Sequence, residues 1–301
     1  MPNSELEAIV DTSDEWIQSR TGIKQRHISR MDESTCDMSA VAAERALRAA
    51  GIDKNQIDLV IVATSTPDQI FPSTACLLQR QLQINNACPA FDVQAVCSGF
   101  VYAITVADKF IKSGTTKNAL VIGADNLSKI VDWNDRDTCV LFGDGAGAVV
   151  LQASDKPGIH ATLLHANGAY AEMLQVPNGV SRPGKDNFIQ MQGSDVFKFA
   201  VTAMDEIVEE VLAGSGMQKQ DIDWLVPHQA NQRIIAATAK KLMLPMSKVI
   251  MTVQEHGNTS AASIPLALDT GVRDGRIKPG QLLLMEAIGG GFAWGAALIR
   301  Y

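Results

Sequence analysis

Residues 86–110 decide the fold, and they read NACPAFDVQAVCSGFVYAITVADKF. The first part, Ala90 to Val96, is short and mostly apolar, which predicts a buried strand. The second part repeats apolar residues with the spacing of one helix face, at Phe100, Ile104, Ala107 and Ile111. The segment therefore predicts a strand that runs directly into a helix, with Cys97 at the joint.

The position of Cys97 suits a nucleophile. A thiol at a helix N-terminus lies near unpaired N–H groups and the positive end of the macrodipole, and both favour the thiolate. The small neighbours Ser98 and Gly99 leave room for a substrate. An unperturbed cysteine has a pKa of about 8.5, so only a small fraction ionises at neutral pH without such help. A packed core thiol is the alternative, and the rest of the chain must supply a base and an oxyanion partner.

Composition limits the classes of protein that fit. The chain has 301 residues, of which 46% are hydrophobic and 20% charged, enough for two domains or one duplicated domain. Its formal net charge of −7 does not favour nucleic acid, and an acidic partner would need a local basic patch. Five cysteines without a CxxC pair argue against a disulfide framework and a metal site.

The sequence also carries expectations about its compartment. The N-terminal residues MPNSELEAIVDTSDEW lack the apolar core of a signal peptide, and no apolar run reaches the length of a membrane span. We therefore expect a cytoplasmic protein with no membrane partner.

Strands and helices alternate along the first half. A capping box at Thr12 and Glu15 predicts a short helix that carries Trp16 and Ile17. Further helices are expected at 38–50, where Gly51 ends the helix, and at 75–83, and strands at 59–64 and 119–123. Residues 142–152 are a glycine-rich turn that leads into a strand. Unpatterned apolar strands between helices predict an α/β fold with buried sheets.

The second half repeats the first. AGIDKNQIDLVIVATS, from Ala50, resembles SGMQKQDIDWLVPHQA, which starts 165 residues later, and CSGFVYAITVADKFIKSG aligns with NTSAASIPLALDTGVRDG at an offset of 161. We expect two duplicated α/β halves, 1–155 and 156–301. The alignment pairs Cys97 with Asn258, so both should head equivalent helices and point into one site. Pro265 should kink the second helix or delay its start.

His228 follows the predicted strand 224–227 in the motif LVPHQAN. The end of a buried strand is where an α/β fold presents functional side chains, although a lone histidine is more often structural. A thiol, an imidazole and an amide donor at strand ends form a coherent set for acyl transfer, with Cys97 in the first half and His228 and Asn258 in the second. The GDGAG segment lacks the lysine and hydroxyl residue of a phosphate loop, and a β-turn explains it better than a nucleotide site.

Six motifs together closely resemble the β-ketoacyl-[acyl carrier protein] synthase III family: DTSDEW, AFDVQAVCSGF, FGDGAGAVVL, LVPHQAN, HGNTSAAS and EAIGGGFAWGAAL. The resemblance covers nearly the whole chain. It implies a thiolase-like fold in a layered αβαβα arrangement and a Cys-His-Asn triad of Cys97, His228 and Asn258. The asparagine separates this family from elongating condensing enzymes, which use two histidines, and from thiolases, which use a second cysteine.

The resemblance also implies binding residues. The oxyanion would be held by the N–H groups of Cys97 and Gly290, although Gly289–Gly291 also fits a plain tight turn between strands. Coenzyme A would be bound by Trp16 and Arg136, which would clamp the adenine, with Arg20 near a phosphate and Asn231 along the channel. Without the resemblance, Trp16 fits a core anchor on an amphipathic helix equally well.

Two further regions follow from the resemblance. Phe71 would reach across a homodimer interface and cap the acyl pocket, favouring a short primer such as acetyl, whereas its sequence context alone favours an ordinary buried loop residue. Carrier-protein docking would centre on Arg233, with Lys198, Lys240 and Lys241 around it. For the last two a solvated helix face is an equal alternative.

The implied reaction is a decarboxylative Claisen condensation of an acyl-CoA with malonyl-acyl carrier protein, through an acyl-Cys97 intermediate and without a metal or redox cofactor. A related enzyme with another primer or a specialised product, and a thioester-binding protein that does not condense, are the alternatives. Family members begin with a strand and a glycine turn before the segment that precedes DTSDEW, and this sequence starts later by that comparison. We therefore expect the sheet of the first half to be completed differently, or the start to have been assigned late.

Overall fold

Two four-stranded sheets organise the computed structural model, which describes residues 1–301. The first sheet has the order β2-β1-β3-β4 and the second the order β5-β10-β9-β8. The strands of the first are β1 (Leu59–Ala63), β2 (Ala90–Val93), β3 (Asn118–Asn126) and β4 (Asp144–Gln152). Those of the second are β5 (Ile159–Ala166), β8 (Trp224–Pro227), β9 (Leu282–Gly289) and β10 (Ala293–Arg300). In both sheets a parallel pair (β1 with β3, β8 with β9) adjoins an antiparallel strand, β4 or β10.

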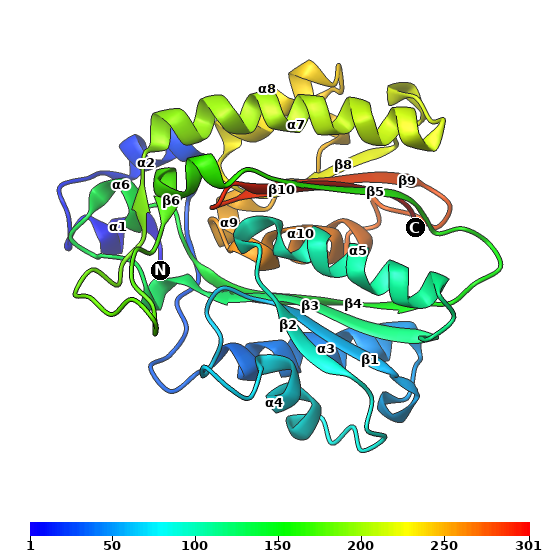
Figure 1. The fold of residues 1–301 in the computed structure, drawn as a ribbon. Coiled ribbons are helices and arrows are strands. Elements are labelled where there is room, and N and C mark those ends of the chain that lie inside the picture. Colours follow the sequence, from blue (N-terminus) through cyan, green and yellow to red (C-terminus); the bar gives the residue numbers. More distant parts are fainter.

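Helices cover both sheets and fill the space between them (Figure 1). Outside the second sheet lie α7 (Gly193–Ser215) and α8 (Gln232–Lys241), and outside the first lie α3 (Thr35–Ala50) and α4 (Thr74–Gln81). Between the sheets lie α5 (Gly99–Lys112) and α10 (Ser263–Arg273). This is the expected αβαβα order of layers.

The remaining elements are short. The short helices are α1 (Asn3–Leu6), α2 (Asp14–Thr21), α6 (Arg136–Cys139) and α9 (Val253–His256). A two-stranded ribbon joins β6 (Leu174–Gln175) to β7 (Gln190–Met191). The 3-10 turns are η1 (Lys54–Gln56), η2 (Val96–Ser98), η3 (Leu127–Lys129), η4 (Gly168–Met173), η5 (Lys219–Asp221), η6 (Met246–Lys248) and η7 (Ser260–Ala262).

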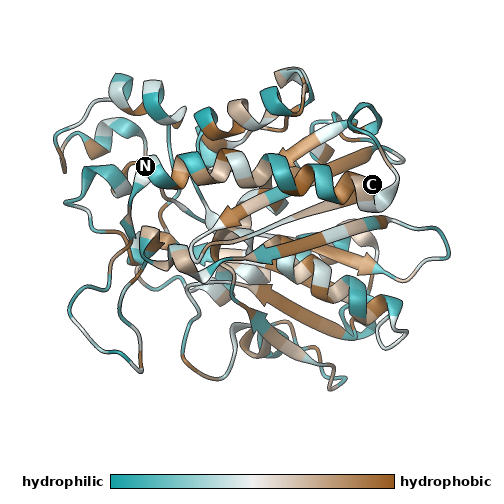
Figure 2. Cartoon of the chain, turned by 45° about the horizontal axis from the view of Figure 1, so that its top comes forward, coloured by the Kyte–Doolittle hydropathy of each residue, from teal (hydrophilic) through white to brown (hydrophobic).

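The core is divided among the layers. Apolar side chains of α5, α10 and the inner faces of both sheets form one cluster between the sheets, and two others lie beneath the outer helices. The central strands are apolar along most of their length (Figure 2), and every residue of β1 and β9 is buried. Continuous burial explains why these strands show no alternating pattern in the sequence.

Several predicted boundaries differ from the structure. The capping box at Thr12 is wrong, because Ser13 caps α2 and its side chain accepts the Trp16 N–H. α3 begins three residues earlier than predicted, at Thr35, where Ser34 and Asp37 cap each other, and it ends at Gly51 as expected. β2 ends at Val93 and is half-buried, because it lies at the edge of its sheet and the chain turns at Val96, whose φ is 49°.

The pairing of Cys97 with Asn258 is also wrong. Val96 and Ser260 both have a φ of 49° and each opens a 3-10 turn that leads into a central helix, so at this end the two halves correspond at an offset of 164. Cys97 therefore corresponds to Ala261. At the far end Gly114 and Gly275 end the helices with nearly equal φ, as predicted from their offset of 161.

The two offsets differ because α10 is three residues shorter than α5, with 11 residues against 14. Pro265 lies in the first turn of α10, where an N–H is not needed, so it does not kink the helix, and α10 starts at Ser263, the counterpart of the first residue of α5. The matching order of strands and helices supports our proposal that the chain is built from two halves, 1–155 and 156–301.

Candidate active site

The turn Val96–Ser98, here called the Cys97 elbow, carries the expected nucleophile. Cys97 lies in η2, immediately before α5, and is only 4% exposed. The start of α5 packs closely against the end of β1, since an added Cβ on Gly99 would lie only 3.2 Å from the Ala63 side chain. The expected nucleophile is therefore at a helix N-terminus, as predicted, and it is shielded from bulk water.

Burial and the helix N-terminus have opposite effects on the pKa of the Cys97 thiol. It raises the pKa of Cys97 to about 12, and the charge of Asp125 adds to this effect. The Ser260 side chain and the backbone N–H of Cys97 oppose it by favouring the thiolate. The resting thiol is therefore neutral, and a proton acceptor is needed when it attacks.

Two backbone N–H groups near Cys97 have no acceptor. Gly289 lies directly against the elbow, since an added Cβ on it would be 2.6 Å from the Cys97 nitrogen. The N–H groups of Cys97 and Gly290 donate no hydrogen bond to the protein. Unpaired buried donors are rare and mark places where a ligand completes the bonding. Gly289–Gly291 also forms the tight turn between β9 and β10, which confirms the turn, whereas the oxyanion role of Gly290 stays a prediction.

His228 follows the last residue of β8 and is 7% exposed. The backbone N–H of His228 donates to the Glu286 carbonyl, and the ring Nδ1 lies 2.7 Å from the Ser263 Oγ. Burial lowers the pKa of His228 to about 3, so the imidazole is neutral. Ser263 Oγ also accepts the Gln229 N–H at 3.3 Å, which leaves its own proton free for Nδ1.

The Asn258 side chain has a fixed orientation. Its Oδ1 accepts the Ser260 N–H at 2.9 Å, so the amide NH₂ is presented as a donor. Asn258 is 7% exposed, and its backbone is held by a bridge to Phe142. Its place is the loop before η7 and not the head of α10.

The segment 258–263 brings the three predicted residues together. Ser260 lies close enough to Cys97 to lower its pKa, although its Oγ makes no well-formed hydrogen bond. Ser263, three residues on, holds His228, and Asn258 is held by the Ser260 N–H. His228 and the Cys97 elbow also lie beside the same end of β9, against Glu286 and Gly289.

Sequence reasoning missed Asp125, which positions this segment. Its Oδ2 accepts the Ala261 N–H, and its Oδ1 accepts the Ser65 N–H and the Thr66 hydroxyl. Full burial raises the pKa of Asp125. A carboxyl at the end of a buried strand, in VIGADN, was the available signal. Ser260 and Ser263 carried no signal, because serine is common at turns.

The residues predicted for coenzyme A lie together at the surface. The guanidinium carbons of Arg20 and Arg136 each lie 4.8 Å from the centre of the Trp16 ring. α2 packs on α8, because the Gly22 that ends α2 lies against Gln232. Asn231 caps α8 through the Ile234 N–H. Arg136 contacts Trp16 directly, so it must swing away before a base can enter between them.

The predicted docking residues lie on the outer helices. Arg233 stacks on Phe197, with its guanidinium carbon 5.7 Å from the ring centre, and Lys198 is the next residue on α7. Lys198 pairs with Asp195 and Lys241 with Asp205, each at 3.3 Å. Arg233 and Lys240 have no carboxylate within ion-pair distance and are both exposed. The available positive charge of the patch therefore lies mainly on these two.

Phe71 lies on the surface. It is 81% exposed, and its neighbour Ile70 is 72% exposed, in the loop that leads to α4. The alternative of an ordinary buried loop residue is wrong. All five cysteines are free thiols. No group of three His, Cys, Asp or Glu side chains is placed to hold a metal ion, and none of the helices has the length and apolar character of a membrane span.

Comparison with known proteins identifies the class first. Two family models match, 3-oxoacyl-[acyl-carrier-protein (ACP)] synthase III over residues 91–168 and its C-terminal model over 212–301. The crystal structure of 3-oxoacyl-[acyl-carrier-protein] synthase III from Aquifex aeolicus superposes with a TM-score of 0.95 at 50% identity, over 100% of this chain and 95% of that one. The fold is therefore that of the thiolase-like condensing enzymes, which are acyltransferases.

Curated relatives then give the family. The β-ketoacyl-[acyl-carrier-protein] synthase III of Thioalkalivibrio sulfidiphilus is 59% identical over 306 aligned residues, covering 100% of this chain and 95% of that protein. The enzyme of the same name from Neisseria meningitidis is 61% identical over 301 residues, covering 99% and 94%. The chain belongs to the β-ketoacyl-[acyl-carrier-protein] synthase III family.

Proposed function

We propose that this protein condenses a short acyl-CoA, acetyl-CoA first of all, with malonyl-acyl carrier protein and so initiates fatty acid synthesis. The observation that carries the proposal is the convergence of a shielded thiol, two unpaired N–H groups, a neutral imidazole and an oriented amide around the end of β9. The reaction runs in two stages through an acyl-Cys97 intermediate, and we propose that it requires no metal or redox cofactor.

In the first stage the Cys97 sulfur attacks the thioester carbonyl of acyl-CoA. A new S–C bond forms, the bond to the CoA sulfur breaks, and the thiol proton passes through His228 to the departing CoA thiolate. The unpaired N–H groups of Cys97 and Gly290 stabilise the oxyanion. The loss of one such donor typically costs about 10²–10³-fold in rate.

In the second stage malonyl-acyl carrier protein replaces CoA. Its carboxylate leaves as carbon dioxide, and the electron pair of the broken C–C bond becomes an enolate. His228 and the Asn258 amide donate hydrogen bonds to the enolate oxygen. The enolate carbon attacks acyl-Cys97, forming the new C–C bond and releasing Cys97 as a thiolate, which takes a proton from solvent.

Ser263 serves His228 in both stages. When Ser263 Oγ donates to Nδ1, the imidazole proton is on Nε2 and can be donated to the enolate oxygen. When Nδ1–H donates to Ser263 Oγ instead, Nε2 is free to accept the thiol proton. A hydroxyl can do both because it is donor and acceptor. The burial that keeps His228 neutral makes this exchange of tautomers available.

The binding surfaces follow from the same proposal. Arg136 first moves off the Trp16 ring, and the adenine then lies between the flat ring of Trp16 and the flat guanidinium of Arg136. Arg20 lies near a phosphate of coenzyme A, and Asn231 lies along the channel. The acidic carrier docks on Arg233 and Lys240, with Lys198 and Lys241 at the margin. The net charge of −7 makes such a local positive patch necessary.

We also propose a homodimer. β2 is an edge strand with one free side, and the loop that leads to α4 exposes Ile70 and Phe71. A second copy that pairs along β2 would cover this apolar loop and bring Phe71 to its acyl pocket. A bulky cap of this kind fits a short primer. We propose a cytoplasmic location, where five free thiols remain reduced.

Mass spectrometry of the intact protein after incubation with a panel of acyl-CoAs tests the proposal. Acetyl-CoA should add one acetyl group to the wild type and to Cys139→Ala, which removes another buried thiol. Cys97→Ala should gain none. Undiminished labelling of Cys97→Ala would contradict the assignment. A preference for a longer primer would contradict only the inference drawn from Phe71.

A further inference from the structure

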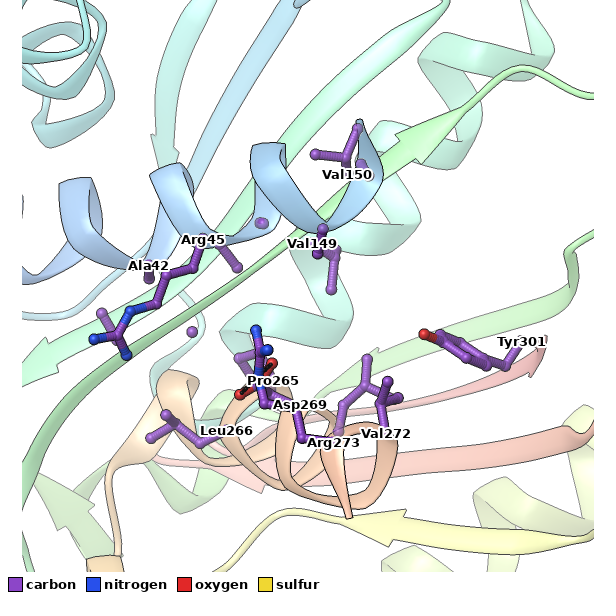
Figure 3. Close-up of a pocket in the computed structure, with 17 residues that line it drawn as sticks. Ala42, Arg45, Val149, Val150, Pro265, Leu266, Asp269, Val272, Arg273 and Tyr301 are labelled. Atoms are coloured by element: carbon purple, nitrogen blue, oxygen red, sulfur yellow. Dashed lines mark hydrogen bonds and ion pairs between the residues drawn. The ribbon is translucent and has the colours of Figure 1, made fainter. Parts of the chain in front are cut away.

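Two cavities of the molecule differ in the polar groups that line them. The larger lies between α3, β4 and α10, and its walls are mainly apolar (Figure 3). No buried side chain that lacks a hydrogen-bond partner lines it. The smaller is enclosed by α7, α8, the end of β9 and the loop 228–230, which carries His228. Its lining includes such side chains, and these indicate what the cavity holds.

The unpartnered side chains of the smaller cavity are Glu286 of β9 and Thr238 of α8. Glu286 is 2% exposed and Thr238 is 1% exposed. The atoms without a hydrogen-bond partner are Glu286 Oε2 and Thr238 Oγ1. Buried polar groups of this kind are rare, because leaving one unpaired costs free energy. A further group in the cavity would complete their bonding.

The size of the cavity limits that group to a water molecule. The volume of about 10 Å³ is at the lower limit for a single water and far too small for an organic ligand. His228 and Ala230 also line the cavity, and neither of their backbone carbonyls accepts a backbone N–H. A water here has up to four polar groups around it, and buried waters make about two to four hydrogen bonds.

The carboxyl of Glu286 is neutral at neutral pH. Burial raises the pKa of Glu286 to about 8, and the negative charge of Asp205 on α7 adds to this effect. The other charged or titratable groups on the surrounding elements are Lys241 of α8, which pairs with Asp205 at 3.3 Å, and the neutral His228. A protonated carboxyl is a hydrogen-bond donor. Glu286 and Thr238 therefore supply two O–H donors, and the two carbonyls supply two acceptors.

We propose that one ordered water fills this cavity, accepts hydrogen bonds from Glu286 and Thr238, and donates to the carbonyls of His228 and Ala230. The water satisfies both unpartnered side chains and ties the loop 228–230 to β9 and α8. Glu286 is then a positioning residue, because it acts on the reaction only through the loop that holds the imidazole. The positioning role rests on the proposed function of His228, whereas the water site does not.

Ionisation of Glu286 would change this pattern of hydrogen bonds. The carboxylate has no proton to donate, so the water must turn one of its own O–H groups towards Glu286. It can then bond only one of the two carbonyls. The loop 228–230 loses one of its ties, and a small displacement of an imidazole is enough to slow a reaction. Decarboxylation should therefore fall as the pH rises through about 8.

The pH dependence of carbon dioxide release from malonyl-acyl carrier protein tests the positioning role. It is measured from pH 6 to pH 9.5 at saturating carrier, with circular dichroism to show that each protein is folded. The wild type should lose about tenfold in rate at the alkaline end. Glu286→Gln, whose amide donates at every pH, should show no such loss, and Glu286→Leu should be slow throughout. An equal alkaline loss in the wild type and in Glu286→Gln would overturn the role.

A matched variant on α7 makes the result specific to Glu286. Asp205→Asn removes a neighbouring acid that does not line the cavity. The alkaline loss should remain but move to lower pH, because Asp205 no longer raises the pKa of Glu286. A loss that stays at the same pH would mean that another group causes it, and would also overturn the positioning role.

A crystal structure of the wild type at pH 6 tests the water site without any assay of activity. We expect density for one water within hydrogen-bond distance of Glu286 and Thr238 Oγ1, and no such water in Thr238→Val. An empty cavity, or a direct bond between Glu286 and Thr238, would overturn the proposal even if the protein condenses its substrates. A protein that holds the water but does not condense them would contradict the proposed function and the positioning role, and leave the water site standing.

Discussion

The two halves carry different residues at two equivalent positions. At the elbow before the central helix the first half has Cys97 and the second half has Ala261. At the end of the central parallel strand the second half has His228 and the first half has Ala63. At these two positions, on the mechanism that we propose, each half supplies one reactive side chain and has alanine where the other half is reactive.

The contact around these positions is the same in both halves. In the second half His228 meets Ser263, the first residue of α10. In the first half Ala63 meets Gly99, the first residue of α5, where an added Cβ would be 3.2 Å away. The backbone framework is thus shared, and the chemistry differs through the side chains placed on it. We propose that one site arises from the two frameworks, with the acyl carrier on the first and its helpers on the second.

The sharpest test of this division concerns Asn258 of the second half. Asn258→Asp keeps the oxygen that accepts the Ser260 N–H but removes the amide donor. Decarboxylation of malonyl-acyl carrier protein should fall by about 10²–10³-fold, because the enolate loses one donor. Acylation of Cys97 by acetyl-CoA should change little. Release of labelled carbon dioxide and intact mass report the two stages separately, and equal losses in both would contradict the division.

The Ser263 contact should matter in both stages. Ser263→Ala leaves the His228 Nδ1 without its partner, so acylation and decarboxylation should each fall by about tenfold. The pH dependence of both rates should shift, because the tautomer of His228 is no longer held. Ser263→Thr, which keeps the hydroxyl, should restore both. Loss of activity with an unchanged pH profile and no rescue would point to a purely structural role.

The outer helices offer a comparison of charge. α8 of the second half carries Arg233 and Lys240, whereas its counterpart α4 carries Arg80 in its last turn. Arg233→Glu should raise the KM for malonyl-acyl carrier protein by about tenfold at low salt, and the effect should shrink as salt screens the charges. Arg80→Glu is the matched control and should leave that KM unchanged. An unaffected KM for Arg233→Glu at low salt would remove the docking surface from α8.

One of the two central strands β3 and β9 carries a buried carboxylic acid that the other lacks. β9 carries Glu286 where β3 carries Ile122, and burial raises the pKa of Glu286 to about 8. The carboxyl of the unfolded chain has its ordinary pKa of 4.5, so the folded state loses stability as the pH rises from there towards 8. Glu286→Gln removes this loss and should raise the free energy of unfolding by about 1–3 kcal/mol at pH 8.

Urea unfolding at pH 5 and pH 8 measures the effect. The two proteins should differ more at pH 8 than at pH 5. A difference that is the same at both values would mean that Glu286 is ionised in the folded protein.

Local pattern was enough for much of the fold. The apolar runs of β1 and β8 were located to within one residue, because a strand buried on both faces leaves a continuous apolar run. The start of α3 was missed because its first turn, from Thr35, has no apolar periodicity and is defined by the cap at Ser34. The partial burial of β2 depends on which strand lies at the edge, and the local sequence does not determine this.

The site was predicted less completely. Cys97 and His228 were found because each follows an apolar strand, and Asn258 because the halves align. The alignment placed Asn258 opposite Cys97, since a loss of three residues from α10 shifts one end of the helix and not the other. Asp125, Ser260 and Ser263 act only through contacts across the fold. The rise in the Cys97 pKa likewise comes from burial, which opposes the expected effect of the helix terminus.

The central claim is that the two halves contribute separate chemical functions to one site, and the most direct test removes the function of one half alone. Cys97→Ala removes the acyl carrier of the first half and leaves His228 and Asn258 of the second half in place. We measure carbon dioxide released from malonyl-acyl carrier protein by this variant, alongside covalent labelling by acetyl-CoA. The two-half account predicts no labelling and continued decarboxylation, well above that of a Cys97→Ala, Asn258→Asp double variant. Decarboxylation reduced to the level of the double variant would contradict it.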